Sequence, residues 1–586
     1  MASFGLSKSR IIAWKQCPKR LWLQINRPDL LIFSDGAQQN FQIGYEVGKA
    51  ARTLFDNGIF VREDIDLSAA LEVTQTMLNV FTFSPRHTIF EGAFQYDGVL
   101  IRADLLIPTT KNYYRFVEVK ASTQVKQYHI DDCAVQAWVL RQNELPLTSI
   151  ELAHIDTSFV YQGDGDYHGL FHYENLDAVV KPLLKQVPEW VAEARRTLAG
   201  DEPAIATGAQ CDDPFECPFK AYCNRDLVVP EPPEYSLDVL YRMSASSKAE
   251  LRNLGIEDAC QVPADSLTEV QQWIQRISQS GVAELKPSAA DMLQDLPYPR
   301  YYLDFETINL AVPRWANTRP YSTQVPFQWS CHIELSEGLL EHEMFLDVTG
   351  DDPRRACAKQ MIAALGKSGP VFVYYQSFEK GRIAELAELF PDLAKKLLAI
   401  NDRIVDLLPI ARANYYHPAM HGSWSIKAVL PTIAPDLDYT QLTVGNGGDA
   451  QQAYQEILHP DTPDARKLEL TEGLRTYCTL DTLAMVRLAW YFQGLQIHYF
   501  MPERVTGERI GMAMVEQIEP LFSNAMDILR QHCQATATGI VVQPVSLLQR
   551  KLRLGYKRAV KLVAEFERRG ILSPPIGVIS NNKSAA

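Results

Sequence analysis

The stretch RYYLDFETINL, residues 300–310, has the pattern of a buried β-strand but carries two acidic residues. Side chains alternate between the two faces of a strand, so Asp304 and Glu306 lie side by side while Phe305 faces the opposite way. Two adjacent carboxylates repel each other unless positive charge lies between them. Because oxygen ligands suit Mg²⁺ or Mn²⁺, the stretch predicts a divalent-metal site on one face of a strand.

Two later segments add acidic residues to this prediction. The segment GPVFVYYQSFEKGRIAEL predicts a buried strand at 371–375 that runs into a helix. Glu379 lies at that junction, where α/β folds commonly place ligands. In LRTYCTLDTLAMVRLAWY the helical spacing places Tyr477 and Asp481 on one face. Four such carboxylates suit a pair of divalent ions that activates water for phosphodiester hydrolysis, and a tyrosine hydroxyl suits the orientation of that water.

The order of these motifs, D-x-E, then an acid after YxxF, then Y-x-x-x-D, resembles the DEDDy branch of the RNase H-like 3′–5′ exonucleases. That family includes the proofreading domains of DNA polymerases and RNase D. The resemblance implies an RNase H-like α/β domain in which Tyr477 positions water and in which the metal ligands are Asp304, Glu306, Glu379 and Asp481. The family usually has aspartate where this chain has Glu379, so the longer side chain is a departure from the pattern at the second metal.

A second candidate site precedes this one. The segment EGAFQYDGVLIRADLLIPTTKNYYRFVEVKAST predicts a meander of strands, with Asp104 on one strand and Glu118 and Lys120 sharing a face of the next. A helix at 131–142 follows and carries Gln136. An Asp, a Glu and a Lys on neighbouring strands suit Mg²⁺ binding with a cation near the attacking water. The alternative is an ordinary surface ion pair between Glu118 and Lys120.

This second pattern resembles the PD-(D/E)XK nuclease fold in its RecB-like branch. The resemblance implies a restriction-endonuclease-like α/β domain in which the Asp and Glu bind metal, the Lys is catalytic and the Gln lies at the edge of the site. Related enzymes often have a histidine in an early helix, where GYEVGKAAR has Gly48. Glu91 and Glu46 are the candidates to replace that missing ligand.

Four cysteines show a one-plus-three layout, with Cys17 far upstream and Cys211, Cys217 and Cys223 in CDDPFECPFKAYC. Four thiolates hold either a [4Fe–4S] cluster or a zinc ion. The layout resembles RecB-like nucleases of the AddB kind, which implies a [4Fe–4S] cluster that joins the two ends of the domain. The five-residue spacers, wider than the C-x-x-C of a zinc ribbon, also favour iron–sulfur. The remaining cysteines are interpreted as ordinary core or surface residues: Cys133, Cys260, Cys331, Cys357, Cys478 and Cys533.

The segment VSLLQRKLRLGYKRAVKLVAEFERRGILSP predicts two helices interrupted at LGY, with basic residues around the second. A helix N-terminus rich in Lys and Arg is well placed against phosphates and groove edges. The segment resembles the winged-helix γ domain of the FtsK DNA translocases, and the likeness implies that duplex DNA is bound by Gln549, Arg550, Arg553, Lys557 and Arg558. The alternative is a solvated basic helix face.

The bulk properties limit the remaining choices. A net charge of −14 argues against a basic coat over the whole surface but allows local basic patches. The absence of an apolar run near ~20 residues predicts no membrane span, and the N-terminal sequence is unlike a signal peptide, so a cytoplasmic location is expected. The expected organisation is an α/β multidomain chain: a RecB-like nuclease domain (1–226), a helical linker region (227–296), a DEDDy exonuclease domain (297–500), a winged helix-turn-helix domain (510–575) and a disordered tail (576–586).

Together these patterns predict a Mg²⁺- or Mn²⁺-dependent deoxyribonuclease with 3′–5′ exonuclease activity. DNA repair, recombination and defence all fit this chemistry, and DNA is the expected partner, with any helicase partner unidentified. Two alternatives remain open. In the first alternative, the chain is an RNA-degrading exonuclease. In the second, it is a DNA-binding scaffold in which one or both nuclease sites are inactive.

Overall fold

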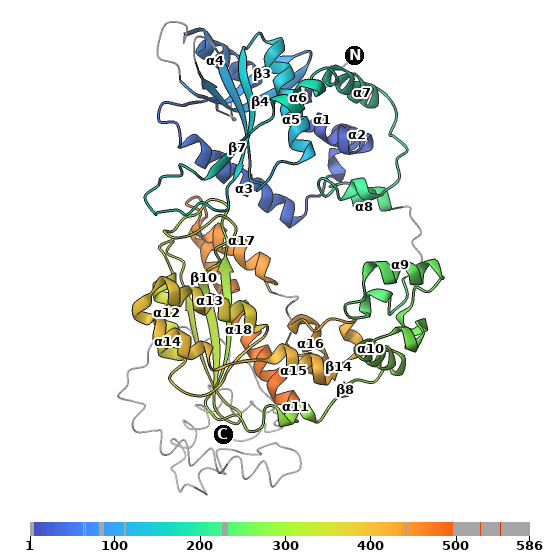
Figure 1. Ribbon diagram of the computed structural model, residues 1–586, viewed down its shortest axis with the longest axis vertical. Helices are drawn as coiled ribbons and strands as arrows, with labels where there is room; N and C mark the ends of the chain where they lie inside the picture. The colour runs from blue at the N-terminus through green and yellow to red at the C-terminus, as the bar shows by residue number, and fades with distance from the viewer. Residues whose placement is uncertain are drawn as a thin grey trace, which may run out of the picture.

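The structure is a computed structural model of the 586-residue chain. It describes residues 5–495, except 63, 65, 81–86, 110–112, 226–231, 438 and 440–441, and beyond them only Ile528 and Lys551. This part of the chain is mixed α/β with several sheets, and Figure 1 shows two sheet-containing units joined by a group of helices. No helix within it has both the length and the apolar character needed to cross a membrane.

A seven-stranded sheet organises the N-terminal unit. Its strands are β1 (Leu6–Ser7), β2 (Ile59–Phe60), β3 (Ile89–Tyr96), β4 (Val99–Pro108), β5 (Tyr114–Lys120), β6 (Leu147–Ile155) and β7 (Phe171–Asn175). The order is β2-β3-β4-β5-β6-β7, with β1 pairing alongside β4. The β3–β4, β4–β5 and β6–β7 pairs are antiparallel, whereas β5–β6 is parallel.

Helices cover both faces of this sheet. They are α1 (Lys8–Gln16), α2 (Pro18–Asn26), α3 (Asp35–Arg52), α4 (Leu67–Val80), α5 (Gln127–Gln142), α6 (Asp177–Leu183), α7 (Val187–Ala199) and α8 (Lys220–Asn224). The alternation along β5 shows the two layers: Phe116 is buried in the core with α4, α5 and α7, and Val117 is buried in the core with α3. Glu118 therefore faces α5.

A small helical region follows, with α9 (Ala245–Asn253), α10 (Glu269–Ser280), β8 (Glu284–Leu285) and α11 (Ser288–Asp291). A capping box between Thr268 and Gln271 begins α10, and Gly281 ends it with a φ of 68° in the left-handed region. Trp273 of α10 is buried in one hydrophobic core with residues of the C-terminal unit. The helical region is thus packed onto that unit.

The C-terminal unit contains a five-stranded sheet in the order β11-β10-β9-β12-β13. Its strands are β9 (Arg300–Ile308), β10 (Val325–Ser336), β11 (Leu339–Leu346), β12 (Val371–Val373) and β13 (Ile404–Asp406), and the short β14 (Tyr415–Tyr416) pairs with β8. Its helices are α12 (Arg354–Ala364), α13 (Gln376–Leu389), α14 (Pro391–Asn401), α15 (Leu407–Asn414), α16 (Ile426–Ile433), α17 (Gly447–Leu458) and α18 (Asp464–Phe492). β9 is antiparallel to β10 and parallel to β12.

The two faces of β9 bury different side chains. Leu303 and Phe305 lie in the core formed with α12, α13 and α14, whereas Tyr302 lies in the core that contains α18. Asp304 and Glu306 share the parity of Tyr302 and therefore face the side covered by α18.

The segment that follows β9, residues 309–324, is called here the interdomain loop because it contacts the N-terminal unit. The backbone N–H of Tyr161 donates to the Thr318 carbonyl (3.0 Å). The hydroxyl of Tyr321 donates to the carbonyl of Ala121, the residue that follows β5 (2.5 Å). Ala311 is buried in the hydrophobic core of α3 and β5. The loop thus connects the ends of two strands that each carry predicted site residues.

Candidate metal centres

The first centre is acidic and is built from β9 outwards. Asp304 lies opposite Ser330 and Glu306 opposite Gln328 in the register with β10. Neither acidic side chain forms an ion pair within the described part of the chain. A carboxylate oxygen of Asp304 and one of Glu306 lie within 4.8 Å of each other and of the Cys478 sulfur. This group is held on α18 and β9, and the positive charge of Lys427 opposes the effect of burial on the pKa values of both carboxyls without overcoming it.

α18 brings the predicted Tyr477 and Asp481 to the same place. Burial raises the pKa of Asp304, and Asp481 adds to this effect, so the two carboxyls are electrostatic neighbours. The Tyr439 hydroxyl donates to Asp481 Oδ1 (2.7 Å), and Lys427 Nζ donates to the Tyr477 hydroxyl (3.2 Å). Each predicted α18 residue is therefore held by a partner from the 427–445 region.

Glu379 reaches the centre from the first turn of α13. Its side chain is buried, and its Oε2 has no hydrogen-bond partner among the described residues. Asp406 caps the same helix end by accepting from the backbone N–H groups of Tyr375 and Gln376, both at 3.0 Å. A buried carboxylate oxygen without a partner is costly, so Glu379 leaves one unsatisfied acceptor at this centre.

Burial raises the pKa of every carboxyl in the acidic centre. After burial, the neighbouring carboxyl of Asp481 raises the pKa of Asp304, and the carboxyl of Asp304 raises that of Glu306. Both pKa values are well above the usual range. Burial raises the pKa of Asp481 to about 6. Burial together with Asp304 raises the pKa of Glu379 to about 9. Opposite charge placed among these groups favours their ionised forms, so the donor set fits hard divalent cations.

Glu379 makes the stability of the metal-free protein depend on pH. A carboxyl whose pKa is about 9 in the fold and near 4.5 when unfolded stabilises the fold below pH ~4.5, and that contribution is lost as the pH rises towards 9. The loss is at most about 1.4 kcal/mol per pH unit. In EDTA-treated protein, Glu379→Gln is therefore expected to raise the melting temperature at pH 8 but not at pH 4.

The matched control for this prediction is Glu385→Gln, an exposed position on the same helix that pairs with Arg382. It is expected to shift the melting temperature little at either pH. Equal melting temperatures for wild type and Glu379→Gln at pH 8 would show that the Glu379 carboxyl is not protonated by burial.

The structure places three further residues at this centre. Cys478 is fully buried, in agreement with its interpretation as a core or surface cysteine, and its sulfur also lies within 4.8 Å of carboxylate oxygens of Asp304 and Glu306. Cys478 directly follows Tyr477, and consecutive residues of a helix lie about 100° apart around its axis, so the sequence did indicate that Cys478 lies near the side of α18 that carries Tyr477. Lys427 and Tyr439 had no such signal, because no spacing rule connects them to the other motifs.

The second centre lies on β4, β5 and α5. Glu118 is buried and accepts hydrogen bonds from Gln136 Nε2 and Lys120 Nζ, both at 2.7 Å. Asp104 Oδ2 accepts from the backbone N–H of Val119 (2.7 Å), which fixes it beside the strand that carries Glu118. The four residues predicted here from sequence therefore lie together.

Two further residues belong to this second centre. Lys8, at the start of α1, donates to Glu118 Oε1 (2.8 Å), and its Nζ lies 3.9 Å from Asp104 Oδ1. Asp132 of α5 accepts from Lys120 Nζ (2.8 Å). Burial acts to lower the pKa of Lys120, but Asp132 and Glu118 outweigh it and raise that pKa well above its usual value. Asp132 lies four residues before the predicted glutamine on one helix face, whereas a lone lysine near residue 8 carries no sequence signal.

Of the two candidate replacements for the missing histidine, Glu91 is the nearer. Burial raises the pKa of Asp104, and the Glu91 carboxylate adds to that effect. Arg52 of α3 lies 3.7 Å from Glu91 Oε1. Glu46 accepts from Gln42, one turn earlier on the same helix, at 3.2 Å.

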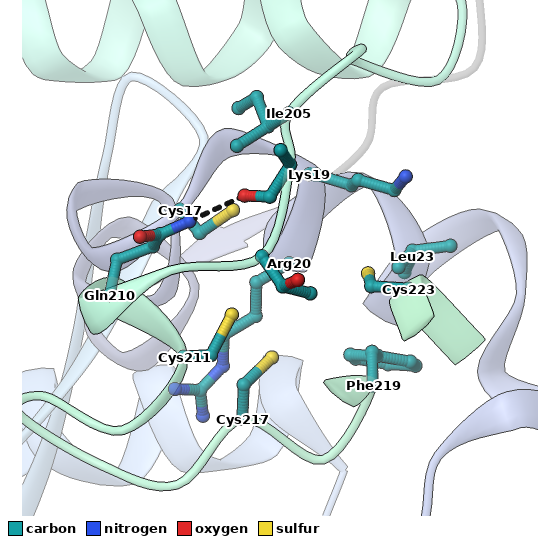
Figure 2. Close-up of a pocket in the computed structure, with 12 residues that line it drawn as sticks. Cys17, Lys19, Arg20, Leu23, Ile205, Gln210, Cys211, Cys217, Phe219 and Cys223 are labelled. Carbon is teal, nitrogen blue, oxygen red and sulfur yellow. Dashed lines mark hydrogen bonds between the residues drawn. The ribbon is translucent and has the colours of Figure 1, made fainter. Parts of the chain in front are cut away.

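A single cavity is lined by all four cysteines of the one-plus-three layout, Cys17, Cys211, Cys217 and Cys223 (Figure 2). Cys17 lies between α1 and α2, and the other three lie just before and within α8. Gln16 Nε2 donates to the backbone carbonyls of Gln210 (2.8 Å) and Phe215 (2.6 Å), so the two distant segments are joined beside the sulfurs.

Four thiols around one cavity suit either a zinc ion or a [4Fe–4S] cluster. Lys19 and Arg20 line the same cavity, and their positive charge suits the negative charge of thiolate ligands.

The comparisons with known families cover two segments of the chain. Residues 301–425, which include Glu379 and all of β9 except Arg300, match a domain of unknown function (DUF2779). Residues 516–580 match the FtsK gamma domain. The tail residues predicted to bind DNA fall within that second match, but they lie outside the described residues: Gln549, Arg550, Arg553, Lys557 and Arg558.

Three relatives match parts of the chain. The uncharacterized protein UU173 of Ureaplasma parvum is 26% identical over 230 residues (36% of this chain, 33% of the relative). The uncharacterized protein MG366 of Mycoplasma genitalium is 26% identical over 223 residues (33% and 32%). The DNA translocase FtsK of Treponema pallidum is 35% identical over 63 residues (11% and 7%). The chain thus spans about a third or less of each relative, and no solved structure gives a significant match.

Proposed function

We propose that this chain is a metal-dependent nuclease that hydrolyses DNA phosphodiester bonds, with 3′–5′ exonuclease activity in its DEDDy-like domain. The supporting observation is the convergence of carboxylates from β9, α13 and α18 on one buried acidic group. A C-terminal DNA-binding domain, supported by the FtsK gamma match, holds the substrate. Repair, recombination and defence against foreign DNA are the processes that fit this activity.

In the proposed exonuclease site, Asp304, Glu306, Glu379 and Asp481 would hold Mg²⁺ or Mn²⁺. Such ions, when bound, activate a water molecule and stabilise the leaving oxygen of the phosphodiester. The fit is supported by the clustering of these carboxyls, whose pKa values burial and neighbouring carboxyls raise, and by the unsatisfied oxygen of Glu379.

The remaining side chains position the reacting groups. The Tyr477 hydroxyl accepts from Lys427 and shares a hydrogen bond with the Asp481 carboxylate, which holds the hydroxyl beside the acidic group, where it would orient the attacking water. Lys427 Nζ is itself fixed by the Gly445 carbonyl (2.7 Å) and lies 4.9 Å from the centre of the Tyr477 ring. Lys427 therefore acts as a positioning residue for Tyr477.

The second centre would act as a RecB-like nuclease site, with Asp104 and Glu118 as metal ligands and Lys120 near the attacking water. Gln136 holds Glu118 in place from the edge. One observation favours an inactive site: Lys8 forms an ion pair with the buried Glu118, where a metal ion would otherwise compensate the charge. A DNA-binding scaffold with this site inactive is therefore the second candidate function, and RNA is the competing substrate for the exonuclease site.

For the cysteine cavity we propose a [4Fe–4S] cluster held by Cys17, Cys211, Cys217 and Cys223. The one-plus-three layout with its five-residue spacers favours this choice over zinc, and the four cysteines line one cavity. The cluster would join the beginning of the N-terminal unit to its end.

The decisive experiment compares the full-length wild type with Asp304→Asn and Lys120→Ala, each separately. End-labelled single- and double-stranded DNA and single-stranded RNA are incubated with Mg²⁺, with Mn²⁺ or with EDTA. Loss of cleavage in one variant assigns the activity to that site, and a preference for RNA replaces the proposed substrate. If the wild type cleaves none of the three polymers with either metal, the nuclease proposal is wrong.

The C-terminal domain gives a separate prediction about duplex binding. Replacing both Arg553 and Lys557 by alanine removes two predicted phosphate contacts. The affinity for duplex DNA at about 0.1 M salt is expected to fall roughly ten-fold, and the slope of log K against log salt should decrease by about 2. Fluorescence anisotropy across a salt series measures both quantities.

Lys395→Ala/Lys396→Ala is the matched control, because it removes the same charge from an exposed part of α14. An equal loss of affinity in this control would show that net charge, rather than the tail, governs duplex binding.

A further inference from the structure

The acidic centre contains one side chain that the exonuclease chemistry does not use. Cys478 is fully buried on α18, and its sulfur lies within 4.8 Å of carboxylate oxygens of both Asp304 and Glu306. Among the described residues, this is the group in which three potential ligand atoms come so close together. The sulfur therefore lies where a cation held by the two carboxylates would contact it.

A second observation points to a ligand at the same place. Glu379 is 3% exposed, and its Oε2 has no hydrogen-bond partner among the described residues. Burial raises the pKa of this carboxyl, and Asp304 is the largest charged cause of the same effect, so the two carboxyls are electrostatic neighbours. The Glu379 carboxyl, on α13, thus brings an unsatisfied oxygen to the neighbourhood of the group.

Oxygen and sulfur donors select different metals. Carboxylates alone suit Mg²⁺ and Mn²⁺, whereas a thiolate is a soft ligand that favours Zn²⁺ and related thiophilic ions. A site that offers both a thiolate and carboxylates to one ion has a metal preference intermediate between the hard ions and the thiophilic ions.

We propose that Cys478 is a metal ligand, and that the acidic centre takes a thiophilic divalent ion, Zn²⁺ or Cd²⁺, on the Cys478 sulfur together with Asp304 and Glu306. In binding, the thiol releases its proton to solvent as the metal–sulfur bond forms, and no oxidation occurs. This inference rests on the proposed metal centre and adds a regulatory property to it: a thiophilic ion displaces the hard ion and stops cleavage.

The binding test uses the full-length protein and enriched ¹¹³Cd²⁺ as the probe. The cadmium NMR shift moves downfield with each sulfur ligand, so a mixed oxygen–sulfur site is resolved from the four-cysteine cavity. Wild type is expected to show one mixed-ligand signal, which Cys478→Ser loses. Cys357→Ser, a buried cysteine of the same unit in a purely apolar core, is the matched control and should retain the signal.

Affinity and inhibition provide the second measurement. Cys478→Ser is expected to bind Cd²⁺ at this site at least about ten-fold more weakly than wild type, and the Zn²⁺ concentration that halves Mg²⁺-dependent cleavage should rise by a similar factor. Asp304→Asn should also lose the mixed-ligand signal, because the same ion contacts both residues.

The outcomes separate this inference from the nuclease proposal. A Cys478-dependent cadmium signal in a protein that cleaves no polymer supports the site and rejects the nuclease. If the protein cleaves DNA but wild type and Cys478→Ser give identical cadmium spectra and identical inhibition by zinc, the nuclease proposal stands and the inference about Cys478 is wrong. A melting curve for Cys478→Ser matching that of Cys357→Ser excludes unfolding as the cause of a lost signal.

Discussion

Replacing Asp304 by asparagine is expected to lower exonuclease turnover by about 10³-fold, which corresponds to roughly 4 kcal/mol of transition-state stabilisation. Asp304 is the central member of the acidic group, because it raises the pKa values of both Glu306 and Glu379 and has Asp481 as its own neighbour. Asparagine keeps the shape of the side chain and removes the charge. Metal binding should therefore weaken while the fold is retained.

Turnover is measured on a 3′-end-labelled strand with saturating Mn²⁺, and folding is checked by circular dichroism. Asp392→Asn is the control, since it removes an aspartate of the same unit that forms only an exposed ion pair with Arg355. A residual activity above a tenth of wild type in Asp304→Asn would place the chemistry elsewhere in the chain.

The second large effect is expected at the cysteine cavity, where Cys17→Ser should abolish iron binding and destabilise the N-terminal unit. Joining residue 17 to residues 211–223 closes a loop of roughly 200 residues, and a cross-link of that size contributes up to about 5 kcal/mol by the loop-closure estimate. The two segments also contact each other through Gln16, through the Lys19–Glu202 ion pair and through the packing of Leu23 against Phe219. These contacts exist only in the folded state, so they do not restrict the unfolded chain as a cross-link does. The variant is expected to melt well below the wild type.

Anaerobically purified protein is assayed for iron, zinc and visible absorption, and unfolding is followed by calorimetry. Cys260→Ser, a half-buried cysteine of the helical region, is the control and should keep both the iron and the melting temperature. Stoichiometric zinc without iron in the wild type would contradict the cluster, and an unchanged melting temperature in Cys17→Ser would contradict the cross-link.

The parts of the two centres that follow a local spacing rule were predictable from sequence. Period-two alternation places Asp304 beside Glu306 on β9 and Glu118 near Lys120 on β5, and the i,i+4 rule places Tyr477 above Asp481. The mixed α/β class followed from the same periodicities. Each of these rules acts within a single element, so it needs no knowledge of the fold.

The residues that sequence reasoning missed depend on contacts between elements. Lys8 reaches Glu118 across 110 positions, and Lys427 reaches Tyr477 across 50. No spacing rule in the sequence identifies Lys8 or Lys427, because each contact depends on how whole elements pack against one another. The position of Cys478 beside Asp304 and Glu306 depends in the same way on how α18 packs against β9.

The interdomain loop means that the two halves of the chain are poor models of the whole when studied apart. An isolated C-terminal fragment would expose Ala311, Val312 and the ring of Tyr321, which are now covered by the N-terminal unit. An isolated N-terminal fragment would lose the hydroxyl that restrains Ala121, immediately beyond the strand carrying Glu118 and Lys120. Fragments would therefore tend to aggregate, and their kinetic constants would differ from those of the same sites in the intact polypeptide.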